Sequence, residues 1–436
     1  MDPPGFIAPS ADVAFRHVRA AGATFARLTL YWSSIAPKPD ARVRPKKLKP
    51  TDPADPGYDW GAFDHQLELA VKHQLEPIVV VVGSPNWGRK QYTGGVSRAD
   101  PVGFGQFAAA AAKRYSGSFQ DLPRVRYWQS WNEPNVGGGV FKKSSASWYR
   151  DLTNHFAAAV HAVHADNSVI AGGTSPFTTQ TAIGPLDFMR QVLCMGHGAA
   201  GRPTCGAKIS FDIWSHHPYT SGGPTHHARS GDDVSLGDLD KVRALLDAAS
   251  RYGRIVSHQR IRFWVTEFSW DSNPPDPQGV PEQLEARWVA EGLYRMWKAG
   301  VSLVVWYRIR DDPLRVSFYQ SGLYYLGPNI AHDRPKPAFR AFRFPFVAFR
   351  EGDQPISVWG RTPWSEPGKV VVEQEASPHR WKPLGTLTAG VRGVFAGSFR
   401  SSLAGPLRAR RAGTTDSSYP FSLQVPPDHF YPVFGS

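Results

Sequence analysis

The sequence predicts an α/β fold, a (β/α)8 TIM barrel followed by a small C-terminal all-β sandwich. Segments with helical periodicity alternate with short apolar runs, and this alternation predicts parallel βα units. The runs are as continuously apolar as strands that are buried on both faces. After residue 350 the helical pattern stops and short alternating strands follow, which predicts the sandwich. A chain of 436 residues is long enough for both parts.

The helices of the barrel follow from their apolar periodicity. The first is expected over 10–21, where Val13, Phe15 and Val18 fall on one face and Gly22 closes the helix. The other expected helices are 63–73, 104–115, 149–164, 186–195, 239–252 and 284–298, and residues 335–349 are expected to supply the last one.

Seven strands are expected between these helices, and they begin ATFARL, PIVVVV, RVRYWQ, SVIAGG, FDIWSH, RFWVTE and VSLVVW. Seven is one short of a closed barrel. The missing strand should precede the first helix, where only the residues around Gly5, Phe6 and Ile7 are available. Either that strand is very short or the natural chain starts further upstream, and we favour the second. We place the barrel at 1–349 and the sandwich, an accessory domain, at 350–436.

Composition excludes several classes of protein. The net charge is +13, but the basic residues are spread along the chain and match no nucleic-acid-binding motif, so no nucleic-acid partner is predicted. No apolar run approaches the roughly 20 residues of a membrane span. The fifteen tryptophans exceed what a core needs and favour stacking on flat ligands, sugars included. The two cysteines, Cys194 and Cys205, either form a disulfide in an exported protein or are two free buried thiols.

Two carboxylates lie at the ends of predicted buried strands. Glu133 follows RVRYWQSWN and Glu267 follows RFWVT. A charge at such a position is costly unless the protein uses it. The ends of parallel strands surround one opening of a barrel, so both side chains are expected to face it. Two carboxylates there, one protonated and one ionised, meet the requirement for cleaving a glycosidic bond, and a separation of about 5–5.5 Å suits retention of configuration.

The surrounding motifs carry a family resemblance. WNEPN at 131–135 and VTEFSW at 265–270 resemble the strand-4 and strand-7 motifs of clan A glycoside hydrolases, the retaining (β/α)8 group, over about residues 10 to 345. The resemblance implies that Glu133 is the acid/base and Glu267 the nucleophile. It also implies that Asn132 bonds the sugar 2-hydroxyl and that Arg27 keeps the nucleophile ionised, as a nearby guanidinium would.

Further residues of the substrate site follow from the same resemblance. His217 and Tyr219 match the His-x-Tyr of strand 6, whose tyrosine donates to the nucleophile, and Trp306 matches the tryptophan under the −1 subsite. Loop packing for the first two and barrel core for Trp306 are the alternatives. Tryptophans near the other strand ends are expected to ring the opening and stack on sugars, and these are Trp32, Trp87, Trp131 and Trp270.

Within the clan the chain resembles family 39 most and family 5 next. VVGSPNW follows the third barrel strand, where family 5 members usually carry a histidine and this chain has Ser84 and Pro85. Family 39 includes β-xylosidases, α-L-iduronidases, arabinose-releasing enzymes and exopolysaccharide hydrolases. The expected substrate is therefore an oligo- or polysaccharide, and the expected protein is a monomer, secreted or in the cell envelope, that degrades polysaccharide.

Other classes of site find less support in the sequence. The pairs His216-His217 and His226-His227 lack ligand spacing on a helix, so we predict no metal. There is no G-x-S-x-G elbow and no phosphate-binding loop, so neither a serine hydrolase nor a nucleotide cofactor is expected. Two alternatives remain: a non-catalytic glycan-binding protein on the same barrel, and an interaction protein whose working part is the sandwich.

Overall fold

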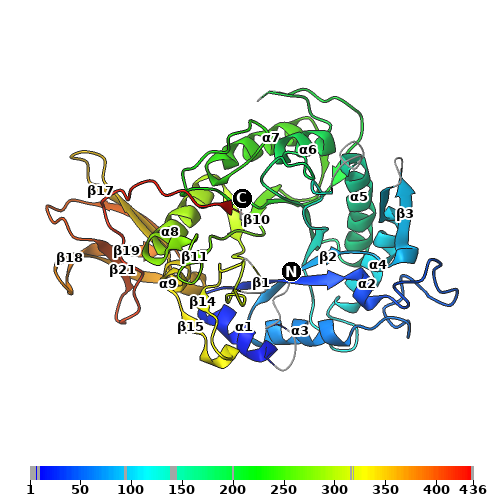
Figure 1. Cartoon of the computed structure of the whole chain (residues 1–436), viewed down its shortest axis with the longest axis horizontal. Helices are drawn as coiled ribbons and strands as arrows, with labels where there is room; N and C mark the ends of the chain where they lie inside the picture. The colour runs from blue at the N-terminus through cyan, green and yellow to red at the C-terminus, as the bar shows by residue number, and fades with distance from the viewer. Residues whose placement is uncertain are drawn as a thin grey trace.

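The central feature of the computed structural model is a sheet of seven parallel strands that curves into a barrel (Figure 1). The structure describes residues 6, 10–92, 96–137, 145–198, 201–314, 317 and 319–433. The strand order confirms the expected sequence of βα units, and the strands are β1 (Phe25–Tyr31), β2 (Glu76–Val82), β5 (Tyr127–Ser130), β6 (Ser168–Thr174), β8 (Ile213–His216), β10 (Arg262–Val265) and β13 (Val301–Val304).

Helices lie between these strands and begin and end within a few residues of the predicted positions. The first, α1 (Ala11–Ala20), precedes β1. The others along the barrel are α3 (Gly61–Lys72), α4 (Pro101–Arg114), α5 (Ser145–Val163), α6 (Pro185–Leu193), α7 (Leu239–Arg251) and α8 (Glu282–Lys298). Shorter elements occupy the loops: α2 (Trp32–Ile35), the hairpin β3 (Arg89–Tyr92) and β4 (Val96–Ala99), and the pairs β7 (Ile209–Ser210) with β9 (Ile255–Val256), β11 (Ser272–Asn273) with β12 (Val280–Pro281) and β14 (Tyr324–Tyr325) with β15 (Arg334–Pro335).

The barrel is open on one side in the described part of the chain. The strand β1 pairs with β2 and the strand β13 pairs with β10, but β1 and β13 do not pair with each other. The eighth strand expected near Gly5 and Ile7 falls on residues outside those described, and Phe6 between them is not in a strand.

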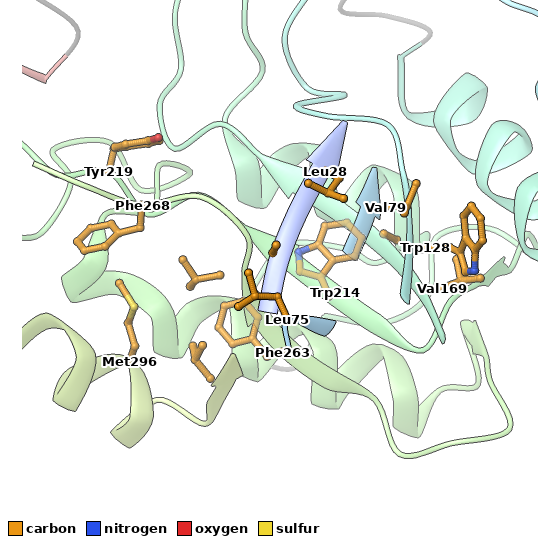
Figure 2. Packing of buried hydrophobic residues seen from close by; sticks show 14 of the residues in the cluster. Leu28, Leu75, Val79, Trp128, Val169, Trp214, Tyr219, Phe263, Phe268 and Met296 are labelled. Atoms are coloured by element: carbon orange, nitrogen blue, oxygen red, sulfur yellow. The ribbon is translucent and has the colours of Figure 1, made fainter. Parts of the chain in front are cut away.

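The apolar runs of the sequence form the core on both sides of the barrel wall. All seven residues of β6 are buried, because helices cover its outer face and other strands its inner face. Figure 2 shows part of this core, with Leu28, Trp214 and Phe263 projecting from barrel strands and all three nearly inaccessible to solvent.

The C-terminal part consists of two three-stranded antiparallel sheets, which lie at one end of the molecule (Figure 1). One sheet contains β16 (Phe346–Phe349), β17 (Ile356–Arg361) and β20 (Val394–Phe399), and the other contains β18 (Gly368–Ser377), β19 (Arg380–Ala389) and β21 (Leu407–Arg411). The expectation of a helix up to residue 349 was wrong in its second half. The helix α9 (Pro337–Arg343) ends early, because 346–349 pairs with β17 as a strand.

The sandwich packs directly on the barrel helices. The ring of Trp359 lies 5.5 Å from that of Tyr294 and 5.6 Å from that of Trp297, both on α8. Arg343 of α9 forms an ion pair with Asp416 at 2.5 Å. Beyond β21 the chain returns towards the barrel (Figure 1). The larger cluster of buried apolar residues has members in both parts.

Two further observations concern the cysteines and the helices. Cys194 and Cys205 are joined by a disulfide and are not two free thiols. None of the helices in the described ranges combines the length and the apolarity that crossing a bilayer requires.

Candidate active site

Glu133 lies at the top of β5, where the backbone leaves the strand in an unusual conformation. Trp131 has φ of +69° and Glu133 has φ of +46°, a region that side-chain-bearing residues rarely adopt. The turn is held because the Glu133 N–H donates to the Gly173 carbonyl at 2.9 Å and the Gln129 amide donates to the Trp131 carbonyl at 3.0 Å. Such local strain at a carboxylate that is 28% exposed is typical of a functional site.

Glu267 follows β10 and is more enclosed. The Tyr219 hydroxyl donates to its Oε1 at 2.9 Å, and Arg27 Nη1 lies 3.5 Å from its Oε2. Burial alone would raise the pKa of this carboxyl, but the charges of His217 and Arg27 and the hydrogen bond from Tyr219 outweigh burial, so the pKa is lowered. Glu267 is therefore ionised at neutral pH.

His217 lies between the two carboxylates. Its side chain is fully buried, and Nδ1 is 3.0 Å from Glu133 Oε1 and 3.9 Å from Glu267 Oε2. Those two oxygens therefore cannot be more than 6.9 Å apart, the sum of the two distances. Nε2 of His217 lies 3.2 Å from the Thr266 hydroxyl, which fixes the ring plane. An upper limit of 6.9 Å allows the roughly 5–5.5 Å separation of the two carboxyl groups in retaining glycosidases. It overlaps only the lower end of the roughly 6.5–9.5 Å range of inverting glycosidases.

Arg27 connects the two halves of this group from β1. Nη2 donates to Asn132 Oδ1 at 2.6 Å, Nε donates to Gln129 Oε1 at 3.1 Å, and Nη1 faces Glu267. Gln129 is fully buried, and the sequence reasoning missed it. The signal was present, because an amide inside an apolar strand, four residues before Glu133, requires a buried partner.

The tryptophans predicted to line the opening do not all face it. Trp32 is 1% exposed and stacks on Phe107 at 5.7 Å, with Trp87 edge-on at 5.6 Å. Trp270 is fully buried and its indole N–H donates to the Gly222 carbonyl. Both rings pack in the layer between loops and helices, so little of either face is open to a sugar.

The remaining predicted tryptophans are only partly buried, so part of each side chain is exposed to solvent. Trp87 is half-buried and its indole N–H donates to the Pro37 carbonyl at 3.0 Å. Trp131 is partly buried and lies edge-on to Trp148. Trp306 is partly buried, donates to the Ser321 carbonyl at 2.8 Å and lies edge-on to Phe268, whose ring in turn neighbours Tyr219 (Figure 2). Trp306 is thus linked to the carboxylate pair through ring contacts, and the buried Trp270 contacts the same Phe268 ring at 4.7 Å.

Two tyrosines complete the surroundings of the carboxylates. Burial raises the pKa of Tyr307 to about 12, and the charge of Glu267 adds to this rise. The pKa of Tyr319 is raised by burial and then by Glu267 and Glu133. The guanidinium of Arg308 lies over both rings, at 5.2 and 4.9 Å, and pairs with Asp312. Tyr319 was missed because it lies in a loop without a strand-end signal.

Within the described ranges, no three His, Cys, Asp or Glu side chains are placed to share a metal ion. The group of residues that the structure brings together is instead a carboxylate pair with a cation, two amides, an imidazole and a phenol: Arg27, Gln129, Asn132, Glu133, His217, Tyr219 and Glu267.

Comparison with known proteins adds information about the fold. No family model matches the chain, and no curated protein matches it in sequence. Among solved structures, a glucosidase from Croceicoccus marinus is similar with a TM-score of 0.51 at 14% identity, over 93% of this chain and 92% of that one.

Two further structures align more loosely. A family 1 β-glucosidase from Thermotoga maritima aligns with a TM-score of 0.45 at 10% identity, over 78% of this chain and 89% of that one. A β-glucuronidase from Bacteroides uniformis aligns with a TM-score of 0.45 at 13% identity, over 95% of this chain and 44% of that one. The chain therefore has the barrel fold found in the Croceicoccus glucosidase.

Proposed function

We propose that the protein is a retaining O-glycoside hydrolase in which Glu133 is the acid/base and Glu267 is the nucleophile. The observation that carries the proposal is the shared contact of both carboxylates with His217, which limits their separation to 6.9 Å. Their different surroundings support the division of roles. Glu267 is enclosed and kept ionised by Arg27 and Tyr219, whereas Glu133 is the more exposed of the two.

In the first step Glu267 attacks the anomeric carbon while Glu133 gives its proton to the glycosidic oxygen. The bond between that oxygen and the anomeric carbon breaks, a bond from Glu267 to the same carbon forms, and the leaving alcohol departs with the proton. Asn132, held by Arg27 at 2.6 Å, is placed to bond the sugar 2-hydroxyl, a contact that strengthens as the charge develops.

In the second step Glu133, now a carboxylate, takes a proton from water. The water oxygen attacks the anomeric carbon, the ester bond to Glu267 breaks, and the carboxylate of Glu267 is restored. Tyr219 then donates again to a full negative charge, so the hydrogen bond favours release of the sugar.

The sequence motifs support a finer assignment. The resemblance of WNEPN and VVGSPNW favours family 39 of clan A, and we propose an oligo- or polysaccharide as the substrate and secretion or the cell envelope as the location. The disulfide between Cys194 and Cys205 is consistent with an oxidising compartment.

The test begins with a screen of nitrophenyl glycosides and of plant, fungal and bacterial polysaccharides, with products separated by chromatography. Glu267→Gln should then lower kcat on the order of 10⁴-fold. Glu133→Gln should lower it about 10²- to 10⁴-fold on poor leaving groups and far less on nitrophenyl glycosides, whose departure needs no proton.

The matched control is Glu351→Gln, an exposed carboxylate in the turn after β16, which should keep full activity. If both active-site variants kept wild-type turnover, the proposal would be wrong. If the unchanged protein bound oligosaccharides tightly and released no product over days, a glycan-binding protein would replace it.

A further inference from the structure

A pocket of about 500 Å³ opens between the loop after α2 and the hairpin of β3 and β4. Figure 1 shows both elements on the side of the barrel that faces away from the sandwich. Arg44 lines the pocket from the loop, Arg89 and Lys90 line it from β3, and Gln106 lines it from α4. Trp87, which precedes β3, forms another part of the wall. Three of these five side chains are cationic, so the pocket favours an anionic ligand.

Carboxylates of the protein do not neutralise the cations of this pocket. Arg44, Arg89 and Lys90 are exposed, and none of the three forms an ion pair within the described part of the chain. Asp100 is the carboxylate among the lining residues, and it accepts a hydrogen bond from the Gly103 N–H at 2.9 Å as the N-cap of α4. The pocket therefore keeps a net positive charge.

The loop after α2 adds positive charge beside the pocket. Between residues 37 and 50 it carries one carboxylate, Asp40, and five exposed cations besides Arg44, which are Lys38, Arg42, Lys46, Lys47 and Lys49. The carboxylates that follow in the loop accept hydrogen bonds from backbone N–H groups, and these are Asp52, Asp55 and Asp59. Cations gathered on one surface repel each other, so their grouping costs stability unless an anion binds there.

Hydrogen bonds hold the loop against the barrel. The Trp87 indole N–H donates to the Pro37 carbonyl at 3.0 Å, and the Asn86 N–H donates to the Pro39 carbonyl at 2.7 Å. Arg44 Nη1 donates to Gln106 Oε1 at 3.2 Å, which holds the guanidinium at the pocket. The cations are thus positioned before a ligand arrives, and this lowers the entropic cost of binding.

A series of ring contacts joins the pocket to the turn that carries Glu133. Trp87 lies edge-on to Trp32 at 5.6 Å, and Trp32 contacts Phe104 at 6.2 Å. Phe104 in turn contacts Trp131 at 5.9 Å, and Trp131 is two residues before Glu133. Trp32 follows β1 and Trp87 follows β2, so the pocket lies at the carboxyl ends of the strands, the same end of the barrel as the carboxylate pair.

We propose that this pocket binds an anionic sugar unit, so that the substrate is an acidic polysaccharide. The inference rests on the proposed function and names the class of substrate. Arg44, Arg89 and Lys90 donate charge-assisted hydrogen bonds to a carboxylate or sulfate substituent. The partly exposed ring of Trp87 packs beside the sugar ring that carries the substituent. A neutral polysaccharide would leave the three cations without a partner.

The experiment measures binding in the Glu267→Gln background, so that the probes are not cut. The probes are pairs of polymers that share a backbone and differ in charge: carboxymethylcellulose and hydroxyethylcellulose, polygalacturonate and its methyl ester, and dextran sulfate and dextran. Affinity electrophoresis gives the Kd for each polymer. The pocket variant combines Arg44→Gln, Arg89→Gln and Lys90→Gln. The matched control removes three exposed cations of the sandwich by Arg380→Gln, Lys382→Gln and Arg400→Gln.

The proposal predicts that the acidic member of at least one pair binds about tenfold or more tightly than its neutral partner at an ionic strength of about 0.1 M. The pocket variant should weaken that binding about tenfold or more, because each exposed charge contact contributes roughly threefold. The control should weaken it less than about twofold. The pair that responds separates carboxylate from sulfate. No preference in any pair, or equal losses in the pocket variant and the control, would overturn the proposal.

A second arm separates a sugar site from a surface that binds any polyanion. Trp87→Leu should weaken binding of the acidic polysaccharide about fivefold or more and leave binding of polyphosphate, which has no sugar ring, unchanged. Trp87→Phe loses the same indole hydrogen bond but keeps a ring, so its affinity should lie between the two. Unchanged polysaccharide binding in Trp87→Leu, or equal weakening of both probes by both variants, would overturn the proposal.

The binding measurements also keep this inference apart from the proposed activity. Circular dichroism and the midpoint of thermal unfolding establish that each variant is folded. Because turnover is not used, a preference for acidic polymers that depends on the pocket would stand even if the unchanged protein hydrolysed nothing. That combination would overturn the proposed glycosidase alone, whereas hydrolysis without an acidic preference would overturn this inference alone.

Discussion

Arg27 and Gln129 together organise the candidate site at the scale of single residues. Each of the three guanidinium nitrogens of Arg27 donates a hydrogen bond, one to Gln129, one to Asn132 and one to Glu267. The position of Arg27 therefore depends on the buried amide of Gln129. The same amide donates to the Trp131 carbonyl and so also supports the strained turn before Glu133. Under the proposed mechanism, Gln129 is a positioning residue that acts through Arg27 and the turn before Glu133.

Replacing Gln129 by alanine should lower kcat roughly 10- to 100-fold with a much smaller change in KM, because a shift of the reacting groups of about an ångström costs that much. Gln129→Glu keeps an acceptor for Arg27 and should recover part of the loss. Steady-state kinetics measures both. The control is Ser130→Ala, whose side chain faces Tyr149 and Thr153 on the other side of the strand. Equal kcat loss in control and test would mean general destabilisation.

Tyr219→Phe should move the acidic limb of the kcat/KM profile to higher pH by about one unit. The hydroxyl stabilises the ionised form of Glu267, a bond to a charged group contributes roughly 1.5 kcal/mol, and one pH unit corresponds to about 1.4 kcal/mol. Without the bond the pKa of Glu267 rises, so activity is lost earlier as the pH falls. Tyr252→Phe, an exposed tyrosine, is the control. If the acidic limb of Tyr219→Phe did not shift, the hydrogen bond from Tyr219 would have no effect on the ionisation of Glu267.

At this scale the structure brings Glu133 and Glu267 together and buries Trp32 and Trp270, while the roles of all four stay predictions. A glutamate that ends an apolar strand has few structural explanations, so Glu133 and Glu267 stood out. A tryptophan near a strand end can point into the opening or back between loop and helix, and both bury it equally well. Trp32 and Trp270 point back between loop and helix, where Trp32 stacks on Phe107 and Trp270 donates to the Gly222 carbonyl. These are tertiary contacts, so the orientation of the two side chains does not follow from the neighbouring sequence.

At the scale of elements, α8, α9 and the loops beside them enclose a cluster of ionisable groups. Lys336 is completely buried and donates to Asp311 at 2.6 Å, to the Ser272 hydroxyl and to the Gln320 carbonyl. Glu285 on α8 is fully buried, and neither carboxyl oxygen has a hydrogen-bond partner among the described residues. Burial raises the pKa of Glu285 to about 8, that of Asp311 to about 7 and that of Asp271 to about 6.

This cluster should make the protein less stable as the pH rises from about 4 to 8. The unfolded carboxyls lose their protons near pH 4, while the folded ones keep them until their raised pKa values, so ionisation favours unfolding across that window. Glu285→Gln should flatten the decline and raise the free energy of unfolding at pH 8 by about 1 kcal/mol or more. Urea unfolding at pH 5 and pH 8 measures it, and an identical pH slope in Glu285→Gln would contradict the argument.

The positions of helices and strands could be predicted where the apolar pattern of the sequence extends over many residues. The helices and the seven barrel strands were confirmed because each repeats its apolar pattern over several turns or a full strand. The segment 346–349 was misassigned because PKPAFRAFRFPFVAF has apolar residues at both helical and alternating spacing. Pairing with β17, which is a tertiary contact, decides between them.

At the scale of the whole molecule, the sandwich and the barrel share one core. The contact surface is aromatic and centres on Trp359, which is 4% exposed and contacts two rings of α8. Further links run from Trp364 to the Arg19 carbonyl and from Tyr431 to Asp271, in the loop that follows Glu267. The sandwich therefore supports the barrel as a structural element, and the division into two domains at residue 349 stays a prediction.

Trp359→Ala should lower the free energy of unfolding by about 3–5 kcal/mol, because it leaves a cavity between the sandwich and α8. Trp381→Ala, a tryptophan of β19 that packs under Arg408, should cost much less. Guanidinium unfolding followed by circular dichroism measures both. A small loss for Trp359→Ala would indicate that the two parts fold independently.

The central claim is that Glu133 and Glu267 act as one pair by double displacement. Proton NMR during the first turnovers on an aryl glycoside tests it most directly, because it reports the anomeric configuration of the sugar before mutarotation. The account predicts that the first sugar released has the same configuration as the substrate, and that Glu267→Gly with azide yields the inverted glycosyl azide. A first product of inverted configuration from the unchanged protein would contradict it.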